Sequence, residues 1–304
     1  MEGNGAASGQ HKAKIQYPLE KIKNAEIRED DIFLITFPKS GTHLLRYMML
    51  LLLSDGEEDA ATVDGRCVLL EIALVEDGDD PVAEAFKSRY ADTKGVHMET
   101  LSSPRFFASH LSYNLLPRQI EEKRPKVIYV ARNPKDLLVS FLNMRRKMPE
   151  FTLYPITLES VVDTFVDGSF NPFDVEDYGS WHEHVLAWWA KKDAENVLFM
   201  KYEDITRNMK DNLRLLARFL GKNVSDEVID KIANLCSIES MRKSAKARND
   251  ALCECLGIPT TEHLFVNKGQ VGGWKKHFTV AQSKRLDEAY RSWMMDSDLE
   301  FDFE

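Results

Sequence analysis

Short apolar runs of strand length alternate along the chain with longer segments whose apolar residues recur at helical spacing. The runs rich in β-branched and aromatic residues predict buried strands at 32–35 (IFLI), 126–130 (KVIYV) and 197–200 (VLFM). Helical spacing predicts helices at 44–53, 136–148, 181–192 and 211–220, the last closed by Gly221. Strands that alternate with helices predict an α/β fold with a central parallel sheet flanked by helices.

The chain has no internal repeat and no shift in composition that marks a domain boundary. Residues 1–16 (MEGNGAASGQHKAKIQ) are small and polar, and predict a disordered N-terminal tail. The acidic stretches 55–64 and 76–80 predict loops. Residues 17–304 are then expected to form a single domain, because 43% hydrophobic residues suffice for a substantial core.

Charge and hydropathy exclude several classes of partner. A net charge of −9 argues against a nucleic-acid partner, which requires a basic face. The longest apolar run, 44–53, is about half a membrane span and carries Arg46. No signal peptide is recognised before it, and a glutamate at position 2 excludes myristoylation. We therefore expect a cytoplasmic protein that does not bind membranes.

The four cysteines do not predict a metal site. They stand at positions 67, 236, 253 and 255, and the pair Cys253-x-Cys255 lacks the spacing of zinc ligands. Free thiols in a reducing compartment are expected. The histidines at 182 and 184 are two residues apart on a predicted helix, so they face different sides and predict no metal site either.

The segment Thr36–Leu53 (TFPKSGTHLLRYMMLLLL) carries the first candidate for chemistry. A tight turn between a buried strand and a helix leaves the first N–H groups of the helix free to bind an anion. Gly41 allows a phosphate to approach the backbone, and Lys39 adds a cation. The pattern is not Walker A, since no GxxxxGK precedes the hydroxyl residue. Taken alone, it also suits an ordinary turn with a surface lysine.

A second candidate follows the strand at 126–130. Arg132 comes directly after this strand, so it is expected in the same crevice as Lys39, beyond the carboxyl ends of the parallel strands. Ser140 lies four residues past Asp136, with a hydroxyl that could reach an anion near Arg132. A loop arginine paired with a surface carboxylate is the simpler alternative, but the agreement of two strand ends favours an anion site.

Two further features are weak when each is considered alone. His110, at a strand end among aromatic and aliphatic residues, could act as a general base at neutral pH, although an isolated histidine is more often structural. Residues 266–276 (VNKGQVGGWKK) place three glycines and three lysines around Trp274. Such a loop could close over a phosphate or could simply be a solvated basic loop.

Together these segments closely resemble the cytosolic sulfotransferase family. The family's donor loop PKSGT stands at Pro38–Thr42, its RNPKDxxVS element at Arg132–Ser140, and its KGxxGxWK loop at Lys268–Lys275. The phrases SPRFFxSHL, WWxKK and YEDxxxN also match, and the resemblance covers about residues 30 to 290. Three motifs in this order and spacing are very specific.

The resemblance implies transfer of a sulfuryl group from 3′-phosphoadenylyl sulfate (PAPS) to an acceptor, through a P-loop-like phosphosulfate-binding loop and without a metal. Lys39 would neutralise the leaving phosphate, and His110 would take the proton of the acceptor. The residues implied to bind the 5′-phosphate are Ser40, Gly41 and Thr42, to which the position of the helix start adds the N–H of His43. Those implied to bind the 3′-phosphate are Arg132, Ser140, Lys268 and Gly269, while Tyr202 and Ser237 match nucleotide contacts.

The acceptor is expected to be a small, largely apolar molecule such as a phenol, steroid, alcohol or amine. Its pocket should be lined by apolar residues, which we expect to include Phe107, Phe141 and Met148. Apolar linings of this kind accommodate many acceptors, so the sequence does not rank them.

Four positions depart from the family pattern. Leu44 and Ile238 replace aromatic residues that pack on adenine, Asn267 replaces an arginine and Ala108 replaces a lysine. Losing one charge-assisted contact costs about 1.5–3 kcal/mol. A catalytically weak relative that binds nucleotide or an apolar ligand without efficient turnover therefore stays open. A P-loop kinase has less support and would require magnesium.

The family's dimer motif, Lys-xxx-Thr-Val-xxx-Glu, is also altered. Lys275, Thr279 and Val280 match it, but Lys284 stands where the motif has glutamate. Like charges would repel where opposite charges should pair, so we expect homodimerisation to be disfavoured.

Overall fold

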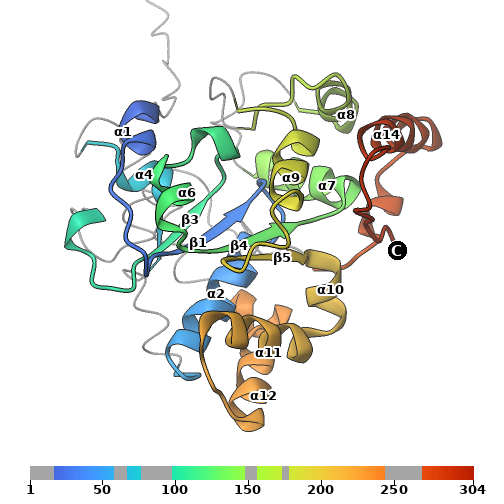
Figure 1. Ribbon diagram of the computed structural model, residues 1–304. Coiled ribbons are helices and arrows are strands. Elements are labelled where there is room, and N and C mark those ends of the chain that lie inside the picture. Colours follow the sequence, from blue (N-terminus) through green and yellow to red (C-terminus); the bar gives the residue numbers. More distant parts are fainter. Residues whose placement is uncertain (1–16, 58–66, 77–97, 148–155, 173–177, 244–268) are drawn as a thin grey trace, which may run out of the picture.

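A five-stranded, wholly parallel sheet forms the centre of the protein (Figure 1). The computed structural model describes residues 17–57, 67–76, 98–147, 156–172, 178–243 and 269–304. The strands are β1 (Ile32–Thr36), β2 (Cys67–Leu69), β3 (Phe106–Ser109), β4 (Lys126–Ala131) and β5 (Val197–Lys201), in the spatial order β2-β3-β1-β4-β5. The prediction of a single α/β domain with a parallel sheet is confirmed.

Helices cover both faces of this sheet (Figure 1). On one face lie α2 (Thr42–Leu53), α11 (Met209–Leu220) and α12 (Asp226–Leu235). Elements that pack on the other face include α1 (Leu19–Lys23), α4 (Leu70–Ala73), η3 (Tyr113–Leu115), α6 (Gln119–Lys123), α7 (Pro134–Arg146), α8 (Leu158–Val166), α9 (Trp181–Trp189) and α14 (Val280–Trp293). The remaining short elements are η2 (Met98–Thr100), α10 (Tyr202–Arg207) and η5 (Gly273–Lys276).

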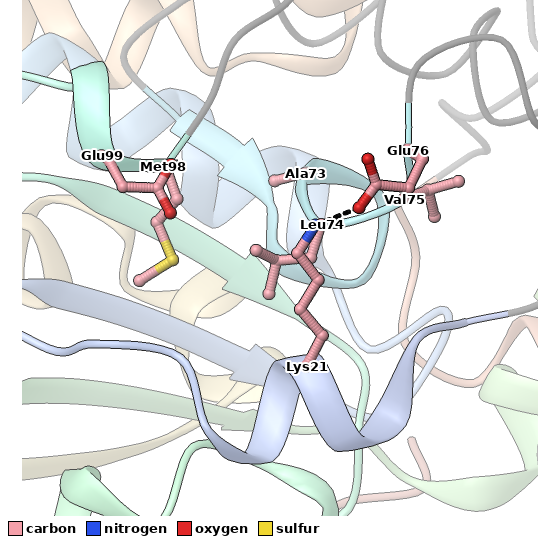
Figure 2. A pocket seen from close by; sticks show the side chains of 7 residues that line it. All are labelled: Lys21, Ala73, Leu74, Val75, Glu76, Met98 and Glu99. Carbon is pink, nitrogen blue, oxygen red and sulfur yellow. Dashed lines mark hydrogen bonds and ion pairs between the residues drawn. The ribbon is translucent and has the colours of Figure 1, made fainter.

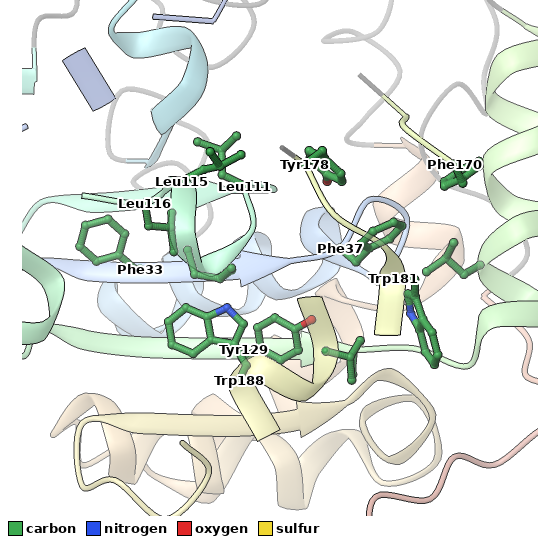
Figure 3. Packing of buried hydrophobic residues seen from close by; sticks show 14 of the residues in the cluster. Phe33, Phe37, Leu111, Leu115, Leu116, Tyr129, Phe170, Tyr178, Trp181 and Trp188 are labelled. Carbon is green, nitrogen blue, oxygen red and sulfur yellow. The ribbon is translucent and has the colours of Figure 1, made fainter. Parts of the chain in front are cut away.

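The two faces hold two separate hydrophobic clusters because side chains alternate along each strand. In β1, Phe33 and Ile35 belong to the cluster beneath α7 and α9, whereas Ile32 and Leu34 belong to the cluster beneath α2 and α11. The first cluster is rich in aromatic side chains, and Figure 3 shows Tyr129 and Trp188 in it. Burial on both faces explains why these strands read as continuous apolar runs in the sequence.

All three strands predicted from the sequence are present, and each is one residue longer than predicted. The apolar pattern does not predict β2, because three residues are too few to show a period. The described strand β3 ends directly before His110, so this histidine lies at a strand end as expected.

The predicted helices are present with shifted ends. α2 begins at Thr42, and α7 begins at Pro134, where the side chain of Asn133 caps it. α9 ends at Trp189, and its continuation to residue 192 consists of turns. Gly221 closes α11 with φ 75°, as predicted.

Other sequence predictions fall partly or wholly outside the described residues. The predicted tail 1–16 and most of the predicted loops at 55–64 and 76–80 lie there. The described part of the first loop, residues 55–57, is a turn that follows α2. Both cysteines in the described ranges, Cys67 and Cys236, are buried free thiols, while Cys253 and Cys255 lie outside these ranges. Of the helices that the structure describes, none combines the length and the apolar character needed to cross a membrane.

Candidate active site

All five strands deliver a chemically useful residue to the same edge of the sheet. In sheet order, Glu71 follows β2, His110 follows β3, Lys39 follows β1, Arg132 follows β4 and Tyr202 follows β5. The carboxyl ends of parallel strands are the usual location of ligand sites in α/β sheets. The candidate site is therefore built by the whole sheet.

The turn between β1 and α2 is shaped to receive an anion. Lys39 and Gly41 both adopt positive φ, 72° and 113°, which turns the chain sharply before the helix. A Cβ atom on Gly41 would lie 2.5 Å from Cδ2 of Tyr202, so glycine is required here for space as well as for conformation. The first hydrogen bond of α2 runs from the N–H of Leu45 to the carbonyl of Gly41 at 3.0 Å. The preceding N–H groups, those of Thr42 and His43 among them, therefore need a partner from outside the helix.

Ser40 supports the same interpretation. Its side chain is fully buried, and its hydroxyl has no hydrogen-bond partner among the described residues. A buried hydroxyl without a partner costs about 1–3 kcal/mol. A phosphate oxygen bound in the turn would remove this cost, so the residues present fit a phosphorylated ligand.

Arg132 meets this turn, as the strand-end argument predicts. Its Nη1 donates a hydrogen bond to the carbonyl oxygen of Lys39 at 3.0 Å, and its Cζ lies 4.4 Å from the centroid of the Tyr202 ring. The Nε of Arg132 is buried without a hydrogen-bond partner among the described residues. Ser140 is buried on α7, the helix that follows Arg132. Lys39 and Arg132 thus share one site.

The C-terminal glycine-rich loop lies against Tyr202 as well. A Cβ atom on Gly269, which has φ 62°, would lie 2.4 Å from Cδ1 of Ile238 and 3.5 Å from the hydroxyl of Tyr202. Ser237 precedes Ile238, is exposed, and donates a hydrogen bond from its hydroxyl to Oγ of Ser240 at 2.9 Å. Lys268 lies outside the described residues.

Asp136 ties this loop to α7, and sequence reasoning did not assign it a role. Its Oδ2 accepts the N–H of Gly272 at 2.8 Å, and its Oδ1 accepts the N–H of Trp274 at 2.9 Å. Asn133 donates to the same carboxylate at 3.0 Å and to Oε1 of the buried Glu203 at 2.9 Å. The only sequence signal for Asp136 is its place inside the RNPKD element.

His110 is connected to the anion-binding turn through Thr36. Its Nδ1 lies 2.9 Å from the carbonyl oxygen and 3.0 Å from the hydroxyl of Thr36, and this hydroxyl lies 2.7 Å from the hydroxyl of Thr42. Because a carbonyl oxygen can only accept, Nδ1 carries the proton of the neutral ring, and Nε2 keeps a lone pair. The side chain of Thr36 therefore joins the ring of His110 to the first residue of α2.

Electrostatics keep His110 neutral. Burial lowers the pKa of His110 to about 4, the positive charge of Lys39 acts in the same direction, and the hydrogen bond to Thr36 opposes both. The ring is thus unprotonated at neutral pH and available to accept a proton.

Glu71 is a buried acid beside this histidine, and it was not foreseen from the sequence. Its Oε1 accepts the backbone N–H of His110 at 2.6 Å, and its Oε2 has no hydrogen-bond partner among the described residues. Burial raises the pKa of Glu71 to about 7, although the hydrogen bond from His110 acts to lower it. The signal was missed because β2, which precedes Glu71, is so short.

The residues expected to line an acceptor pocket differ in placement. Phe107 is fully buried and packs on Phe33 with ring centroids 5.3 Å apart, which places it in the core of the sheet. Phe141 lies on α7 and meets Phe170 edge-on at 4.9 Å. Met148 lies outside the described residues.

Three of the four residues that depart from the family pattern lie in the described ranges. Ala108 and Leu44 are buried in the hydrophobic cluster that includes α2, and the side chain of Ile238 lies next to Gly269. Asn267 lies outside the described residues.

A cavity of about 170 Å³ follows the helix α4 that carries Glu71 (Figure 2). It is lined by Lys21, Ala73, Leu74, Val75, Glu76, Met98 and Glu99. None of the sequence-predicted site residues that the structure describes takes part in the lining.

Within the described ranges, no three His, Cys, Asp or Glu side chains are grouped so that they could hold a metal ion. His182 stacks on Trp293 with ring centroids 4.6 Å apart, and His184 is buried with hydrogen bonds to Tyr129 and to the main chain.

A parallel α/β sheet that brings a tight helix-start turn, an arginine and a neutral histidine to one edge suits an enzyme that transfers a group from a phosphorylated donor. Residues 29–298 match the family described as Sulfotransferase domain. The chain belongs to the sulfotransferase family.

Curated relatives agree with this assignment. The chain is 34% identical to the amine sulfotransferase of Oryctolagus cuniculus, with 93% of this chain and 87% of the relative covered. It is 33% identical to sulfotransferase 1C2 of Homo sapiens, with 92% of this chain and 88% of the relative covered.

Solved structures show the same fold. The mouse sulfotransferase SULT7A1 complexed with PAP (3′,5′-adenosine diphosphate) superimposes with a TM-score of 0.69 at 30% identity. The match covers 92% of this chain and 90% of that one. A retinol dehydratase superimposes with a TM-score of 0.77 at 23% identity, covering 92% of this chain and 85% of that one, and supports the fold alone. The protein is thus a PAPS-dependent sulfotransferase, and nothing among its relatives favours the alternative of a catalytically weak relative.

Proposed function

We propose that the protein transfers the sulfuryl group of PAPS to a hydroxyl or amine of a small, largely apolar acceptor, with His110 as general base. One observation carries this assignment: Thr36 bonds both to the ring of His110 and to Thr42 in the anion-binding turn. The base is therefore held beside the position where a donor phosphate would bind.

The donor would be bound at both of its phosphates. Ser40, Gly41, Thr42 and His43 would bind the 5′-phosphate through hydroxyl and N–H groups at the start of α2. The buried hydroxyl of Ser40, without a partner among the described residues, supports this part of the proposal.

The 3′-phosphate would be bound by Arg132, Ser140, Lys268 and Gly269, with Tyr202 and Ser237 against the nucleoside. Arg132 packs on the ring of Tyr202, and a Cβ atom on Gly269 would lie 3.5 Å from the hydroxyl of the same residue; both observations support a single pocket for these groups. Arginine suits the task because its planar fork of donors matches phosphate oxygens.

The reaction is a direct displacement at sulfur. As the acceptor oxygen or nitrogen forms its bond to sulfur, Nε2 of His110 takes the acceptor proton, and the bond from sulfur to the 5′-phosphate oxygen breaks. The electron pair stays on the phosphate, where Lys39 offsets the growing charge. Positioning and electrostatic stabilisation supply most of the rate enhancement in such group transfers.

Phenols, steroids, alcohols and amines belong to the proposed acceptor class. An amine sulfotransferase among the relatives adds weight to the amines. We further propose that residues 17–304 form one domain that works in the cytoplasm without nucleic-acid or membrane partners, and that its homodimer is disfavoured. The net charge of −9 supports the absence of a nucleic-acid partner.

A sulfate-transfer assay tests the proposal. With labelled PAPS and a panel of phenols, steroids and amines, His110→Ala and Lys39→Met are each expected to lower turnover by about 100-fold or more. Lys210→Met is the control: it alters a lysine of α11 that pairs with Asp230 of α12, and this variant should retain full turnover. Undiminished transfer by a folded His110→Ala or Lys39→Met variant would exclude the role assigned to that residue.

A further inference from the structure

The main chain on either side of His110 is bonded to three buried side chains. Its N–H donates to Oε1 of Glu71 at 2.6 Å. Its carbonyl oxygen accepts the hydroxyl of Tyr178 at 2.7 Å and lies 3.3 Å from Nε2 of His184. The same Nε2 lies 3.1 Å from the carbonyl oxygen of Leu111. Loops at strand ends are usually solvated, whereas the main chain at His110 is held by buried polar side chains.

The hydrogen bonds of His184 have a defined direction. Both partners of its Nε2 are carbonyl oxygens, so Nε2 carries the proton, and Nδ1 must accept. The hydroxyl of Tyr129 lies 2.8 Å from Nδ1 and donates to it. Burial lowers the pKa of His184 to about 4, so the ring is neutral and keeps this tautomer at physiological pH.

His184 also contacts the loop that binds the donor. Its ring meets the ring of Phe37 edge-on, with centroids 5.5 Å apart, and Phe37 directly precedes Pro38 and Lys39. Tyr178 meets Phe37 edge-on as well, at 5.8 Å. Figure 3 shows Phe37 and Tyr178 near each other at the end of the sheet, with Tyr129 further back along it. The buried imidazole of His184 thus contacts both the main chain at His110 and Phe37, which leads into the proposed donor loop.

We propose that His184 is a positioning residue for sulfuryl transfer: with Tyr129 and Tyr178 it fixes the main chain of His110 relative to the donor loop. The inference rests on the proposed role of His110 as general base. His184 itself contacts neither substrate in this scheme. Its effect arises because the reacting atoms must be aligned closely, and displacement of a catalytic group by about 1 Å costs up to about 100-fold in rate.

Three variants test this role. His184→Phe keeps a ring and removes the hydrogen bonds of both ring nitrogens. It should lower kcat by about 10- to 100-fold while the acceptor KM and the Kd for PAP change by less than about threefold. His184→Gln keeps a donor and an acceptor, and should recover part of the loss. Tyr178→Phe removes a single hydroxyl, and should lower kcat by about 3- to 10-fold.

A double variant separates positioning from general stabilisation. In the His110→Ala background, His184→Phe should leave the residual turnover unchanged, because a residue that acts through His110 has no further effect once the imidazole is gone. An additional loss comparable to that in the wild-type background would overturn the inference. So would unchanged kcat in folded His184→Phe, or a rise in the Kd for PAP as large as the fall in kcat.

The outcomes also distinguish this inference from the proposed function. Full turnover by His110→Ala would remove the base role itself, whatever His184 does. An inactive His110→Ala variant beside fully active His184→Phe and Tyr178→Phe variants would leave the function standing and remove only the positioning role. Should His184→Phe fail to fold, Tyr178→Phe decides by itself, because it deletes one oxygen atom, and unchanged kcat would overturn the inference.

Discussion

The carboxylate of Asp136 accepts the backbone N–H of Trp274 at 2.9 Å, although 138 residues separate the two in sequence. Asp136 stands in the first turn of α7, directly after the loop that carries Arg132. Trp274 stands in η5, at the end of the glycine-rich loop that begins near Gly269. One side chain therefore sets the distance between two segments proposed to bind the same phosphate.

Replacing Asp136 with alanine should weaken donor binding more than it weakens the fold. Two charge-assisted hydrogen bonds to the loop are lost, and we expect the Kd for PAP to rise by about tenfold or more. Calorimetric titration with PAP measures this change. Asp226→Ala is a matched control, because Asp226 is also an acid in the first turn of a helix and pairs with an arginine away from the site. An equal loss of affinity in both variants would contradict the role of Asp136.

Gly41→Ala should abolish donor binding. The added Cβ would lie 2.5 Å from Cδ2 of Tyr202, so the ring that packs on Arg132 would have to shift. In addition, φ 113° is strained for any residue other than glycine. The conformational part alone costs about 1–2 kcal/mol. Thermal unfolding and PAP titration measure the two effects.

Gly168→Ala provides the control for backbone strain. Gly168 has φ 82°, but a Cβ atom there would have no neighbour within 4 Å. This variant should lose about 1–2 kcal/mol of stability and bind PAP normally. Normal PAP binding by Gly41→Ala would mean that the turn does not receive the donor phosphate.

The residues on the donor side of the site could be predicted from the sequence, because the apolar runs show where the buried strands end. Lys39 and Arg132 each follow an apolar run that is clearly a buried strand, and the parallel sheet brings such ends together. Glu71 follows a strand of three residues, which gives no periodic signal. The roles of Asp136 and His184 depend on contacts with residues more than 70 positions away, and only the folded chain shows them. The start of α7 differs from the predicted start because its cap, Asn133, acts through a side-chain hydrogen bond rather than through apolar spacing.

Glu71 should make the stability of the protein depend on pH. Its pKa is about 7 in the folded protein, against 4.5 as the ordinary value. Between these values the Glu71 carboxyl holds a proton in the folded chain that it has released in the unfolded chain, so the contribution of Glu71 to stability falls as pH rises from about 4.5 to about 7. The loss amounts to about 3 kcal/mol by linkage and levels off above pH 7.

Glu71→Gln should remove this dependence, because the amide does not titrate. Urea unfolding of the wild type and the variant from about pH 5 to about pH 8 measures the difference between their free energies of unfolding. The variant should become relatively more stable as pH rises. Glu288→Gln, which changes an exposed carboxyl on α14, should run parallel to the wild type. If the curves of wild type and Glu71→Gln stay parallel, Glu71 is not protonated in the folded protein.

We expect the protein to be a monomer, because the residues around the start of α14 disfavour dimerisation. Val280 is 87% exposed there, an apolar residue that matches the family's dimer motif. Lys284 replaces the glutamate of that motif and lies 3.9 Å from Glu288, while Lys275 pairs with Glu304 at 2.7 Å. Two lysines brought together across an interface would repel, by an amount that falls with ionic strength.

Sedimentation at micromolar concentration should therefore show a monomer for the wild type. Lys284→Glu restores the charge of the motif opposite Lys275 and should shift the protein toward a dimer, most strongly at low salt. Val280→Asp in the Lys284→Glu background should return it to a monomer, because the exposed valine supplies the apolar contact. Two outcomes would contradict this prediction. If the wild type is a dimer and Val280→Asp does not dissociate it, another surface forms the dimer. If the wild type is a dimer and Val280→Asp does dissociate it, Lys284 does not oppose dimerisation.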